Sequence, residues 1–282
     1  MKVHHLNCAT LCPRGGRWIN GSGIPLAKAR LVCHCLLIES PAGLVLVETG
    51  LGEDDVHGRR GWSYSRKLRR IGARLAPEET ARAQLEQLGF RAADVQHVIL
   101  THLDLDHAGG LADFPQATVH VLLDEHDAAQ ARRGLSGKQR YRPETWAHGP
   151  RWALHARGQG EPWFGFEAVR ELPGLPPELL LVPLPGHTPG HCGVAVEAGE
   201  GWLLHAGDAY FHADQVLEPP RCPPALKLFQ LAVASDRGRF VANQGRLREL
   251  NRDPRVTVFS AHDPNEFERL RAAAGRREEA RA

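Results

Sequence analysis

Short apolar runs separated by turns rich in glycine and proline dominate the hydrophobic and polar pattern of this chain. Runs of roughly four to eight Val, Ile, Leu and aromatic residues are typical of strands, and strands buried on both faces lack polar alternation. On this basis strands are predicted at residues 3–7, 31–38, 44–47, 97–100, 118–122, 179–184, 192–196, 202–205 and 256–259. Pro and Gly between the second and third runs predict a hairpin there.

Apolar positions at helical spacing lie between several of these runs. They predict helices at residues 78–88, 124–132, 225–232 and 238–250, and Gly89 is suited to cap the first of them. Residues 1–30 show no further regular pattern, and the charged, Ala-rich tail from Arg269 is expected to form a helix that frays. The order of helix, strand and polar loop is typical of an α/β fold.

The regular pattern breaks down over residues 134–177, where Gly, Pro and Arg are frequent. Aromatic residues are also frequent in this span and include Trp146, Trp152, Trp163, Phe164 and Phe166. A long loop inside a compact domain is usually functional or mobile. The rings could form an apolar lid beside a pocket or pack the insertion onto the core, and the lid is the preferred interpretation. We predict one domain over residues 1–282 that carries this insertion.

Composition narrows the class of protein. The chain has 282 residues, 42% of them hydrophobic, so it can bury a sizeable core, while its formal charge of +2 does not indicate a nucleic-acid partner. The Arg- and Lys-rich residues 59–74 are interpreted as a solvated helix face or a loop beside a pocket. No apolar run approaches the ~20 residues of a membrane span, and the N-terminus lacks the apolar segment of a secretory signal. We therefore expect a cytoplasmic protein with six reduced cysteines, no nucleic-acid or membrane partner, and a small-molecule substrate; a homodimer is left open.

Cysteines near the N-terminus raise the question of a separate zinc site. Cys8 and Cys12, and then Cys33 and Cys35, do not have the two-residue gaps of common structural zinc sites. The second pair falls within the predicted strand 31–38, where a thiol packs as a small apolar group. No separate zinc site is therefore expected here.

Four side chains that can bind metal follow the predicted strand 97–100 within six positions. Imidazole and carboxylate are ligands that zinc, iron and manganese accept. In an extended segment His102, Asp104 and Asp106 would share a face, and a turn near Asp106 would bring His107 to a neighbouring position. This spacing suits two adjacent metals better than one; the alternative is a solvated polar loop.

Further candidate ligands follow later strands in the same way. His187 lies between rigid Pro-Gly steps beyond one predicted strand, Asp208 follows another, and His262 follows the last. Glu48 ends the strand 44–47 directly before Thr-Gly. It could orient a metal ligand from behind or face water, and the sequence leaves both interpretations open.

Together these motifs resemble the ordered metal signatures of the metallo-β-lactamase superfamily. They are Thr-His-x-Asp-x-Asp-His-x-Gly-Gly, then Pro-Gly-His-Thr-Pro-Gly-His, then Gly-Asp, then a late His at a strand end. Within the superfamily the chain is most similar to the branch of N-acyl-homoserine lactonases and related lactone and ester hydrolases. The resemblance implies an α/β fold of four layers, an αββα sandwich, and two divalent metals, with zinc expected.

The resemblance also implies a ligand set. One metal would be held by His102, Asp104 and His187. The other would be held by Asp106, His107 and His262. Asp208 would bridge the two metals, whereas His191 matches a motif position that is generally not a ligand.

Two positions depart from the family pattern. Asp104 stands where a His is usual, which adds negative charge, weakens the metal as a Lewis acid and makes iron or manganese alternatives to zinc. Tyr210 lies two positions after Asp208, close to where lactonases of this branch carry a Tyr, and is the candidate oxyanion donor.

The implied reaction is attack of a metal-bound hydroxide on a carbonyl. Asp106 or Asp208 would take the proton and pass it to the leaving alkoxide. The expected substrate is a lactone or ester, such as an acyl-homoserine lactone, with an apolar arm against the aromatic insertion.

Other functions remain open at this stage. A thioester hydrolase of the hydroxyacylglutathione type would use the same metals, and the basic residues 59–74 could meet the carboxylates of its substrate. An iron-dependent oxidoreductase of this fold carries an acid at the position of Asp104, but no flavodoxin-like segment is expected in this chain. A binding protein with a vestigial site is the non-enzymatic alternative.

Overall fold

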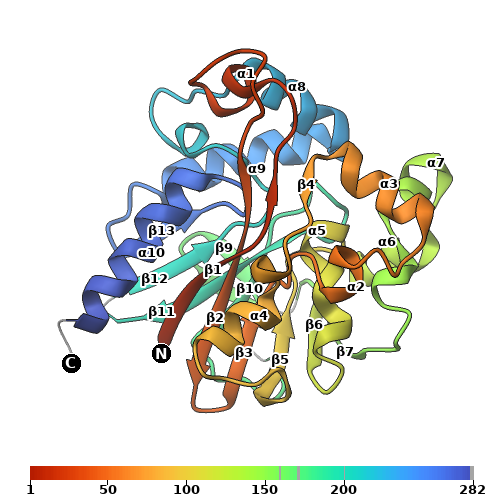
Figure 1. The fold of residues 1–282 in the computed structure, drawn as a ribbon. Coiled ribbons are helices and arrows are strands. Elements are labelled where there is room, and N and C mark those ends of the chain that lie inside the picture. Colours follow the sequence, from red (N-terminus) through yellow and green to blue (C-terminus); the bar gives the residue numbers. More distant parts are fainter. Residues whose placement is uncertain (159, 170–171, 200, 280–282) are drawn as a thin grey trace.

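Two β-sheets stacked face to face form the centre of the computed structural model, which describes residues 1–158, 160–169, 172–199 and 201–279 (Figure 1). Within these residues the first sheet has the strand order β4-β1-β2-β3-β5-β6-β7 and the second β10-β11-β12-β13. The strands of the first sheet are β1 (Lys2–Leu11), β2 (Leu31–Ser40), β3 (Gly43–Val47), β4 (Ala73–Arg74), β5 (Val95–Ile99), β6 (Thr118–Leu122) and β7 (Arg151–His155). Those of the second are β10 (Leu179–Pro183), β11 (Cys192–Ala198), β12 (Gly201–His205) and β13 (Val256–Phe259). A separate hairpin pairs β8 (Glu161–Trp163) with β9 (Phe166–Ala168).

Helices cover the outer faces of both sheets and the upper end of the molecule in Figure 1. The α-helices are α1 (Gly16–Asn20), α2 (Glu53–Val56), α3 (Trp62–Arg70), α4 (Ala81–Gln87), α5 (Leu105–Ala108), α6 (Leu123–Ala131), α7 (Gly134–Arg140), α8 (Pro224–Val233), α9 (Arg237–Leu250) and α10 (Pro264–Glu279). Short 3₁₀ turns lie at Pro77–Glu79, Ala92–Asp94, Gly109–Asp113, Pro143–Thr145 and Ala213–Val216. The predicted helix at 78–88 is confirmed as α4, and Gly89 follows it with φ +86°.

Side chains of β2 point alternately to its two faces, and this explains how the layers pack on either side of the first sheet. Leu36 and Ile38 pack between the sheets in one cluster with Leu179 of β10. Leu37 points the other way and packs against Leu85 of α4. Because β2 is buried on both faces, its sequence is largely apolar apart from the buried His34 and the terminal Glu39 and Ser40, and each large apolar side chain contributes roughly 1.5–3 kcal/mol on burial.

The outer face of the second sheet is covered in the same manner. Leu180 and Val182 of β10 pack with Leu247 of α9. Helices therefore lie outside both sheets, and the four-layer αββα sandwich expected from the sequence is confirmed.

The N-terminal segment and the aromatic insertion are more regular than predicted. β1 continues to Leu11 and α1 follows it, and the span 134–177 contains α7, β7, β8 and β9. Trp163 and Phe166 pack onto the outer face of the second sheet, and Trp146 packs into the core outside the first. The prediction of an aromatic lid is therefore wrong: these rings hold the insertion on the core, because burial of a large ring there is favourable.

Other expectations can be compared directly with the described residues. All six cysteines are free. No helix in this part of the chain combines the length and the apolar character that crossing a membrane requires. The tail from Arg269 continues α10 as far as Glu279, and residues 280–282, where fraying was expected, lie outside the described residues.

Strand direction places the candidate ligands together. β3 and β5 run parallel, β12 and β13 run parallel, and β10 has the same direction as β12 because both are antiparallel to β11. Their carboxyl ends therefore open toward the same end of the molecule, beneath α1 and α8 in Figure 1. Loops at such ends are where α/β folds usually place their sites.

Candidate metal centre

The helix α5 divides the first motif into two halves. Asp104 occupies the position before α5, yet its side chain makes no capping hydrogen bond, unlike most Asp residues there. The His107 N–H donates to the Asp104 carbonyl over 3.1 Å, which closes the first turn. This turn carries Asp106 and His107 to a different side from His102 and Asp104, as the spacing predicts.

Asp208 lies between these two halves. Its Oδ2 atom is 3.3 Å from His187 Nε2 and 3.8 Å from His102 Nε2. Its Oδ1 atom is 3.0 Å from His262 Nε2 and 3.3 Å from His107 Nε2. Each carboxylate oxygen therefore faces its own pair of imidazoles.

We call the residues facing Oδ2 the first side and those facing Oδ1 the second side. The first side consists of His102, Asp104 and His187. The second side consists of Asp106, His107 and His262. Asp104 Oδ2 is 3.1 Å from His187 Nε2 and 3.6 Å from His102 Nε2. Asp106 Oδ2 is 3.8 Å from His262 Nε2 and 4.0 Å from His107 Nε2. The structure thus brings all seven predicted ligands together.

The donors suit divalent cations. His102 Nε2, His107 Nε2 and Asp208 Oδ1 are buried and have no hydrogen-bond partner among the described residues. Each buried polar atom without a hydrogen-bond partner costs about 1–3 kcal/mol. These three atoms therefore destabilise the protein when no cation is bound between them. Imidazole nitrogens and carboxylate oxygens at these separations are ligands that zinc, iron or manganese accept.

Contacts behind the rings fix which nitrogen faces inward. His107 Nδ1 donates to Glu48 Oε2 over 2.7 Å, and His262 Nδ1 donates to the Val32 carbonyl over 2.7 Å. His102 Nδ1 lies 2.9 Å from Thr101 Oγ1. With Nδ1 engaged, Nε2 is the nitrogen left for a cation.

Glu48 is one of these supporting residues. Its side chain is 1% exposed, and besides His107 it accepts the Thr101 N–H over 2.6 Å. Burial would raise its pKa, but the adjacent His107 holds the pKa of Glu48 below its ordinary value. Its backbone has φ +64°, a conformation unusual for a residue other than Gly and often found at functional sites. Of the two interpretations left open by the sequence, the structure favours orientation of a ligand.

His191 supports the centre without facing it. Its Nδ1 donates to the Leu184 carbonyl over 3.0 Å, and its Nε2 accepts the Asp208 N–H over 2.9 Å. Gly207 fits beside it with φ +53°, where an added Cβ would lie 2.7 Å from His191 Nε2. His191 and Gly207 therefore position the backbone of Asp208.

The charges on the two sides differ. Arg140, at the end of α7, places its Nη1 3.3 Å from Asp104 Oδ2, with a side chain only 13% exposed. Burial would raise the pKa of Asp104, but Arg140 and the rings of His102 and His187 hold it well below its usual range. The negative charge that Asp104 adds to the centre is thus offset by a guanidinium, which the sequence did not indicate.

Asp208 affects its neighbours in the same way. Burial would raise its pKa, but His262 and His107 hold the pKa of Asp208 well below its ordinary value. In turn its carboxylate raises the pKa of both rings despite their burial. Burial dominates at His187, whose pKa is lowered.

Tyr210 does not reach the centre. Its side chain is fully buried, and its hydroxyl donates to Glu266 Oε1 over 2.8 Å. The prediction that Tyr210 donates to an oxyanion is corrected, because its hydroxyl is occupied in the core. The next ring, Phe211, lies at the centre instead, 4.6 Å from the His262 ring and 6.1 Å from the His187 ring.

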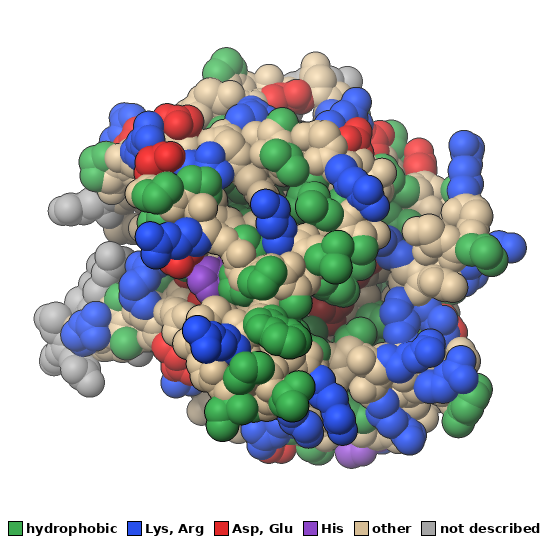
Figure 2. Space-filling model, turned by 90° about the horizontal axis from the view of Figure 1, so that it is seen from above, with side chains coloured by type: hydrophobic (Ala, Val, Ile, Leu, Met, Phe, Trp, Pro, Cys, Tyr) green, Lys and Arg blue, Asp and Glu red, His purple; other side chains and the backbone are tan. Residues whose placement is uncertain are grey.

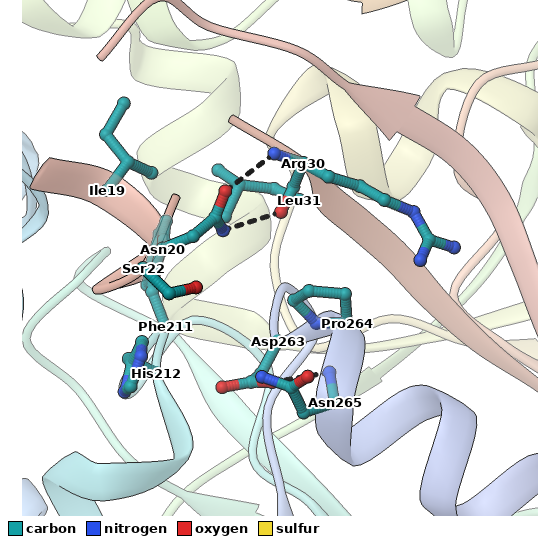
Figure 3. A pocket seen from close by; sticks show the side chains of 10 residues that line it. All are labelled: Ile19, Asn20, Ser22, Arg30, Leu31, Phe211, His212, Asp263, Pro264 and Asn265. Carbon is teal, nitrogen blue, oxygen red and sulfur yellow. Dashed lines mark hydrogen bonds between the residues drawn. The ribbon is translucent and has the colours of Figure 1, made fainter. Parts of the chain in front are cut away.

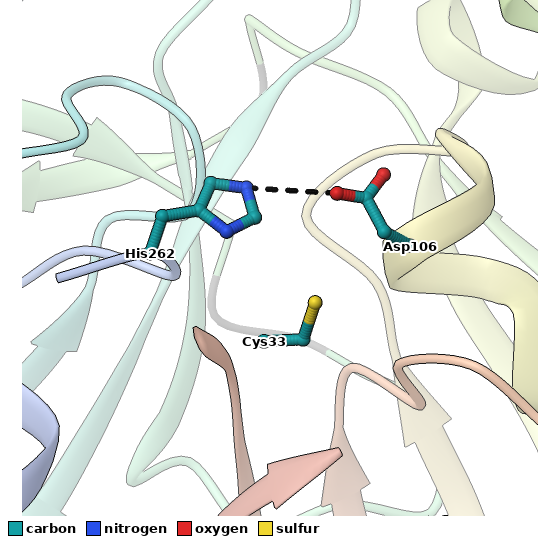
Figure 4. A group of neighbouring side chains, drawn as sticks. All are labelled: Cys33, Asp106 and His262. Carbon is teal, nitrogen blue, oxygen red and sulfur yellow. Dashed lines mark ion pairs between the residues drawn. The ribbon is translucent and has the colours of Figure 1, made fainter. Parts of the chain in front are cut away.

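Cys33 is a second residue that sequence reasoning missed. Its sulfur forms a group with the carboxylate of Asp106 and the ring of His262, whose potential ligand atoms all lie within 4.8 Å of one another (Figure 4). The thiol was expected only to pack in strand 31–38. No local pattern could have placed it here, because β2 meets the segment before His262 only in the folded chain.

A polar cavity of about 220 Å³ is lined by Phe211, whose ring is 4.6 Å from that of His262, and by Asp263, the next residue after His262; no candidate ligand is among its lining residues (Figure 3). Its lining includes Asn20, Arg30, Phe211 and Asp263. Asn20 hydrogen-bonds to both the backbone N–H and the carbonyl of Arg30, which fixes this part of the lining. None of the residues lining it belongs to the aromatic insertion.

Exposed hydrophobic residues lie on the same end of the molecule. Figure 2, which looks down on this end, shows hydrophobic side chains near the middle of the face, with Lys and Arg side chains around them. The exposed large hydrophobic residues of α1, the loop after it and α8 are Trp18, Ile24, Leu26, Leu228 and Phe229. Phe229 reaches toward the centre, with its ring 6.0 Å from that of Phe211.

Two residues of the basic run, Arg60 and Lys67, are engaged within the structure. Arg60 forms a buried ion pair with Asp55 over 2.7 Å, and Lys67 donates to the Arg140 carbonyl over 3.3 Å. Arg66 lies over the ring of Trp62 at 4.6 Å. The remaining basic residues, Arg59, Arg69, Arg70 and Arg74, are exposed like Arg66, as a solvated face predicts, whereas Lys67 holds α3 against α7.

Comparison with known proteins agrees with this architecture. A family model described as the metallo-beta-lactamase superfamily matches residues 29–262. A probable metallo-hydrolase of Mycobacterium tuberculosis is 41% identical over 278 residues, which cover 97% of this chain and 84% of that protein. An N-acyl homoserine lactonase of Bacillus cereus is 25% identical, with 87% of this chain and 86% of the relative covered.

Solved structures show the same fold. An N-acyl homoserine lactone hydrolase with the product N-hexanoyl-L-homoserine bound at its catalytic metal center superposes with a TM-score of 0.70. The match covers 95% of each chain at 21% sequence identity.

Proposed function

The chain belongs to the metallo-beta-lactamase superfamily and is a hydrolase of that superfamily, and we propose that it is a binuclear enzyme that opens a lactone or cleaves an ester. An acyl-homoserine-lactone-like compound is the proposed substrate type. The relatives and neighbours that act on acyl homoserine lactones support this choice.

The observation that carries the proposal is the arrangement around Asp208. One carboxylate oxygen faces His102 and His187, and the other faces His107 and His262, so a single residue can serve two cations. Divalent cations held there, with zinc as the expected metal, would supply hydroxide at neutral pH and a Lewis acid for the carbonyl oxygen.

The two central carboxylates suit different tasks. Asp208 is enclosed by imidazoles that keep its pKa well below the ordinary value, so it is a poor proton acceptor. Asp106 is more open, with a side chain 17% exposed and its nearest ring nitrogens at 3.8 and 4.0 Å. We assign Asp106 the transfer of the proton to the leaving alkoxide.

The polar cavity and the apolar surface suggest how a substrate lies. The cavity beside Asp263 and Asn20 offers hydrogen-bonding groups for a polar head. Phe211 and Phe229 lead from the centre toward the exposed hydrophobic residues of α8. We therefore place the apolar arm along these two rings, in place of the aromatic insertion favoured by the sequence.

The alternatives receive less support. A glutathione thioester needs free cations for its carboxylates. Arg60 and Lys67 of the basic run are engaged within the protein, whereas Arg66, Arg69 and Arg70 are exposed, so the substrate panel must separate this alternative. Asp104 suggested iron chemistry, but Arg140 offsets its charge.

A substrate panel tests the proposal. Lactones, aryl esters and thioesters that share one acyl chain would be assayed with the full chain loaded with zinc, manganese or iron. Metal-stripped protein and an Asp208→Ala variant are the blanks. We expect kcat/KM to be highest for a lactone or ester; preference for the thioester, or oxygen consumption without hydrolysis, would contradict the proposal.

A further inference from the structure

We propose that Cys33 is an additional protein ligand on the second side of the centre, so that a cation beside Asp106, His107 and His262 also binds sulfur. This inference rests on the proposed function of the site as a metal centre. The carrying observation is the group formed by Cys33, Asp106 and His262, whose ligand atoms lie within 4.8 Å of one another. In Figure 4 the sulfur points into the space between the imidazole and the carboxylate.

The backbone holds Cys33 in this position from both sides. The Val32 N–H donates to the His262 carbonyl over 3.3 Å, and the His34 N–H donates to the Ala261 carbonyl over 2.9 Å. The N–H of Cys33 itself donates to Asn7 Oδ1 over 3.0 Å. These contacts fix the register of β2 against the segment carrying His262, and the side chain of Cys33 is only 2% exposed.

A second observation at the same place points to a ligand. His107 Nε2 is buried, its side chain is 2% exposed, and it has no hydrogen-bond partner among the described residues. Both His107 and His262 also face Asp208 Oδ1, at 3.3 and 3.0 Å, and this oxygen likewise has no hydrogen-bond partner among the described residues. Cys33 therefore lies beside metal-binding atoms that have no hydrogen-bond partner when no cation is present.

Packing alone is the competing explanation for a buried thiol. Cys35, on the same strand and the same face as Cys33, is an example of a buried thiol that only packs in the core. It is 1% exposed, its sulfur donates weakly to the Cys33 carbonyl at 3.6 Å, and it packs with Cys8 in the core. Within the described residues Cys35 belongs to no group that could hold a metal. Substitution of Cys35 is therefore the matched control for substitution of Cys33.

Sulfur would make the two sides chemically unequal. Thiolate is a soft ligand that favours zinc, whereas the first side offers only imidazole and carboxylate and is the harder site. Binding requires the thiolate, so formation of the metal–sulfur bond releases the thiol proton to solvent.

X-ray absorption of the zinc-loaded full chain tests the proposal. Zinc bound to sulfur shows a distance of about 2.3 Å, distinct from about 2.0–2.2 Å for nitrogen and oxygen. Cobalt-loaded protein should show a thiolate-to-cobalt charge-transfer band in the near ultraviolet. We expect both signals in the wild type and in Cys35→Ala, and neither in Cys33→Ala. The Kd of the second-side equivalent, which we expect to be the more tightly held one, should rise at least about tenfold in Cys33→Ala, the lower end of what an outer partner contributes.

The outcomes separate this inference from the function on which it rests. Two bound zinc ions with no sulfur contact, or a sulfur contact that persists in Cys33→Ala, would overturn the role of Cys33 and leave the proposed function standing. Failure of the wild type to bind metal at all would overturn both. If Cys33→Ala does not fold, as judged by circular dichroism, Cys33→Ser replaces it, and the wild-type spectrum already decides whether sulfur is bound.

Discussion

The two sides of Asp208 have the same number of carboxylates and imidazoles but different surroundings. On the first side, Asp104 lies 3.3 Å from the Arg140 guanidinium, which cancels part of the charge that a cation would meet. On the second side, His107 is backed by the Glu48 carboxylate at 2.7 Å, and Cys33 adjoins Asp106. A carboxylate behind an imidazole makes it a stronger ligand. We therefore expect the second side to bind its cation more tightly.

Removing the shared carboxylate should have the largest effect, because it acts on both sides at once. We expect Asp208→Ala to lose both metals and to reduce kcat/KM by about three orders of magnitude or more, above the roughly 10–100-fold cost of an outer partner. Elemental analysis alongside kinetics measures this. His187→Ala is the companion variant and should lose metal from the first side alone. Retention of two metals by Asp208→Ala would show that the sides do not depend on it.

Arg140→Gln removes the guanidinium that makes the charge of the first side differ from that of the second. The buried Asp104 carboxylate then loses its cation, which should lower the free energy of unfolding of the metal-free protein by about 3–5 kcal/mol. Metal binding on the first side should become tighter, because the charge of Asp104 is no longer offset. Urea unfolding and metal titration measure the two effects.

Arg59→Gln is the control for Arg140. It removes an exposed pair with Asp54 at 3.4 Å and should change stability by less than about 1 kcal/mol. Equal effects of the two variants would mean that Arg140 contributes no more than a surface charge.

Glu48→Gln should weaken the second side selectively. Without the carboxylate behind it, His107 is a poorer and less well oriented ligand, and the affinity of that side should fall by about 10–100-fold. Glu125→Gln is the matched control: this buried acid accepts the backbone N–H groups of Leu103 and Gly190 over 3.0 and 3.1 Å, and no hydrogen bond between it and a ligand ring is found among the described residues. It should affect stability more than metal affinity, and the reverse result would contradict the assignment of Glu48.

A row of histidines lies away from Asp208. Substitution of one of them distinguishes the acid sensitivity of the fold from that of the metal centre. His120 lies 2.9 Å from His97 and 3.1 Å from His155, nitrogen to nitrogen, across β5, β6 and β7. Burial and these neighbouring rings lower the pKa of His120 to about 3. Below about pH 6.5 the unfolded chain takes up a proton that the folded chain does not, so stability falls as the pH falls.

The corresponding loss between pH 7 and pH 5 is about 2 kcal/mol for one such group. His120→Gln should therefore make the acid dependence of the metal-free protein shallower by this amount, as measured by urea unfolding at both pH values. The ligand histidines titrate in both proteins and cancel in the difference. An unchanged pH dependence would place the acid sensitivity at the centre instead.

Local sequence was sufficient for most of the framework. The apolar runs predicted β2, β3, β6 and the second sheet, because a strand buried on both faces leaves a continuous hydrophobic signal. The ligand residues were recognisable because each follows a strand end with rigid turns around it. The predictions failed for Tyr210 and the aromatic insertion, where the direction in which a side chain points depends on what it packs against.

The sequence by itself determined where the strands form and which metal-capable side chains follow them, since both depend on periodicity and spacing within a few residues. Only the tertiary structure decided that Arg140 meets Asp104 and that Cys33 meets Asp106. The hydrogen bond from His262 to Val32 spans 230 positions. Contacts of this kind form only when sheets pack and registers are set, so no local pattern encodes them.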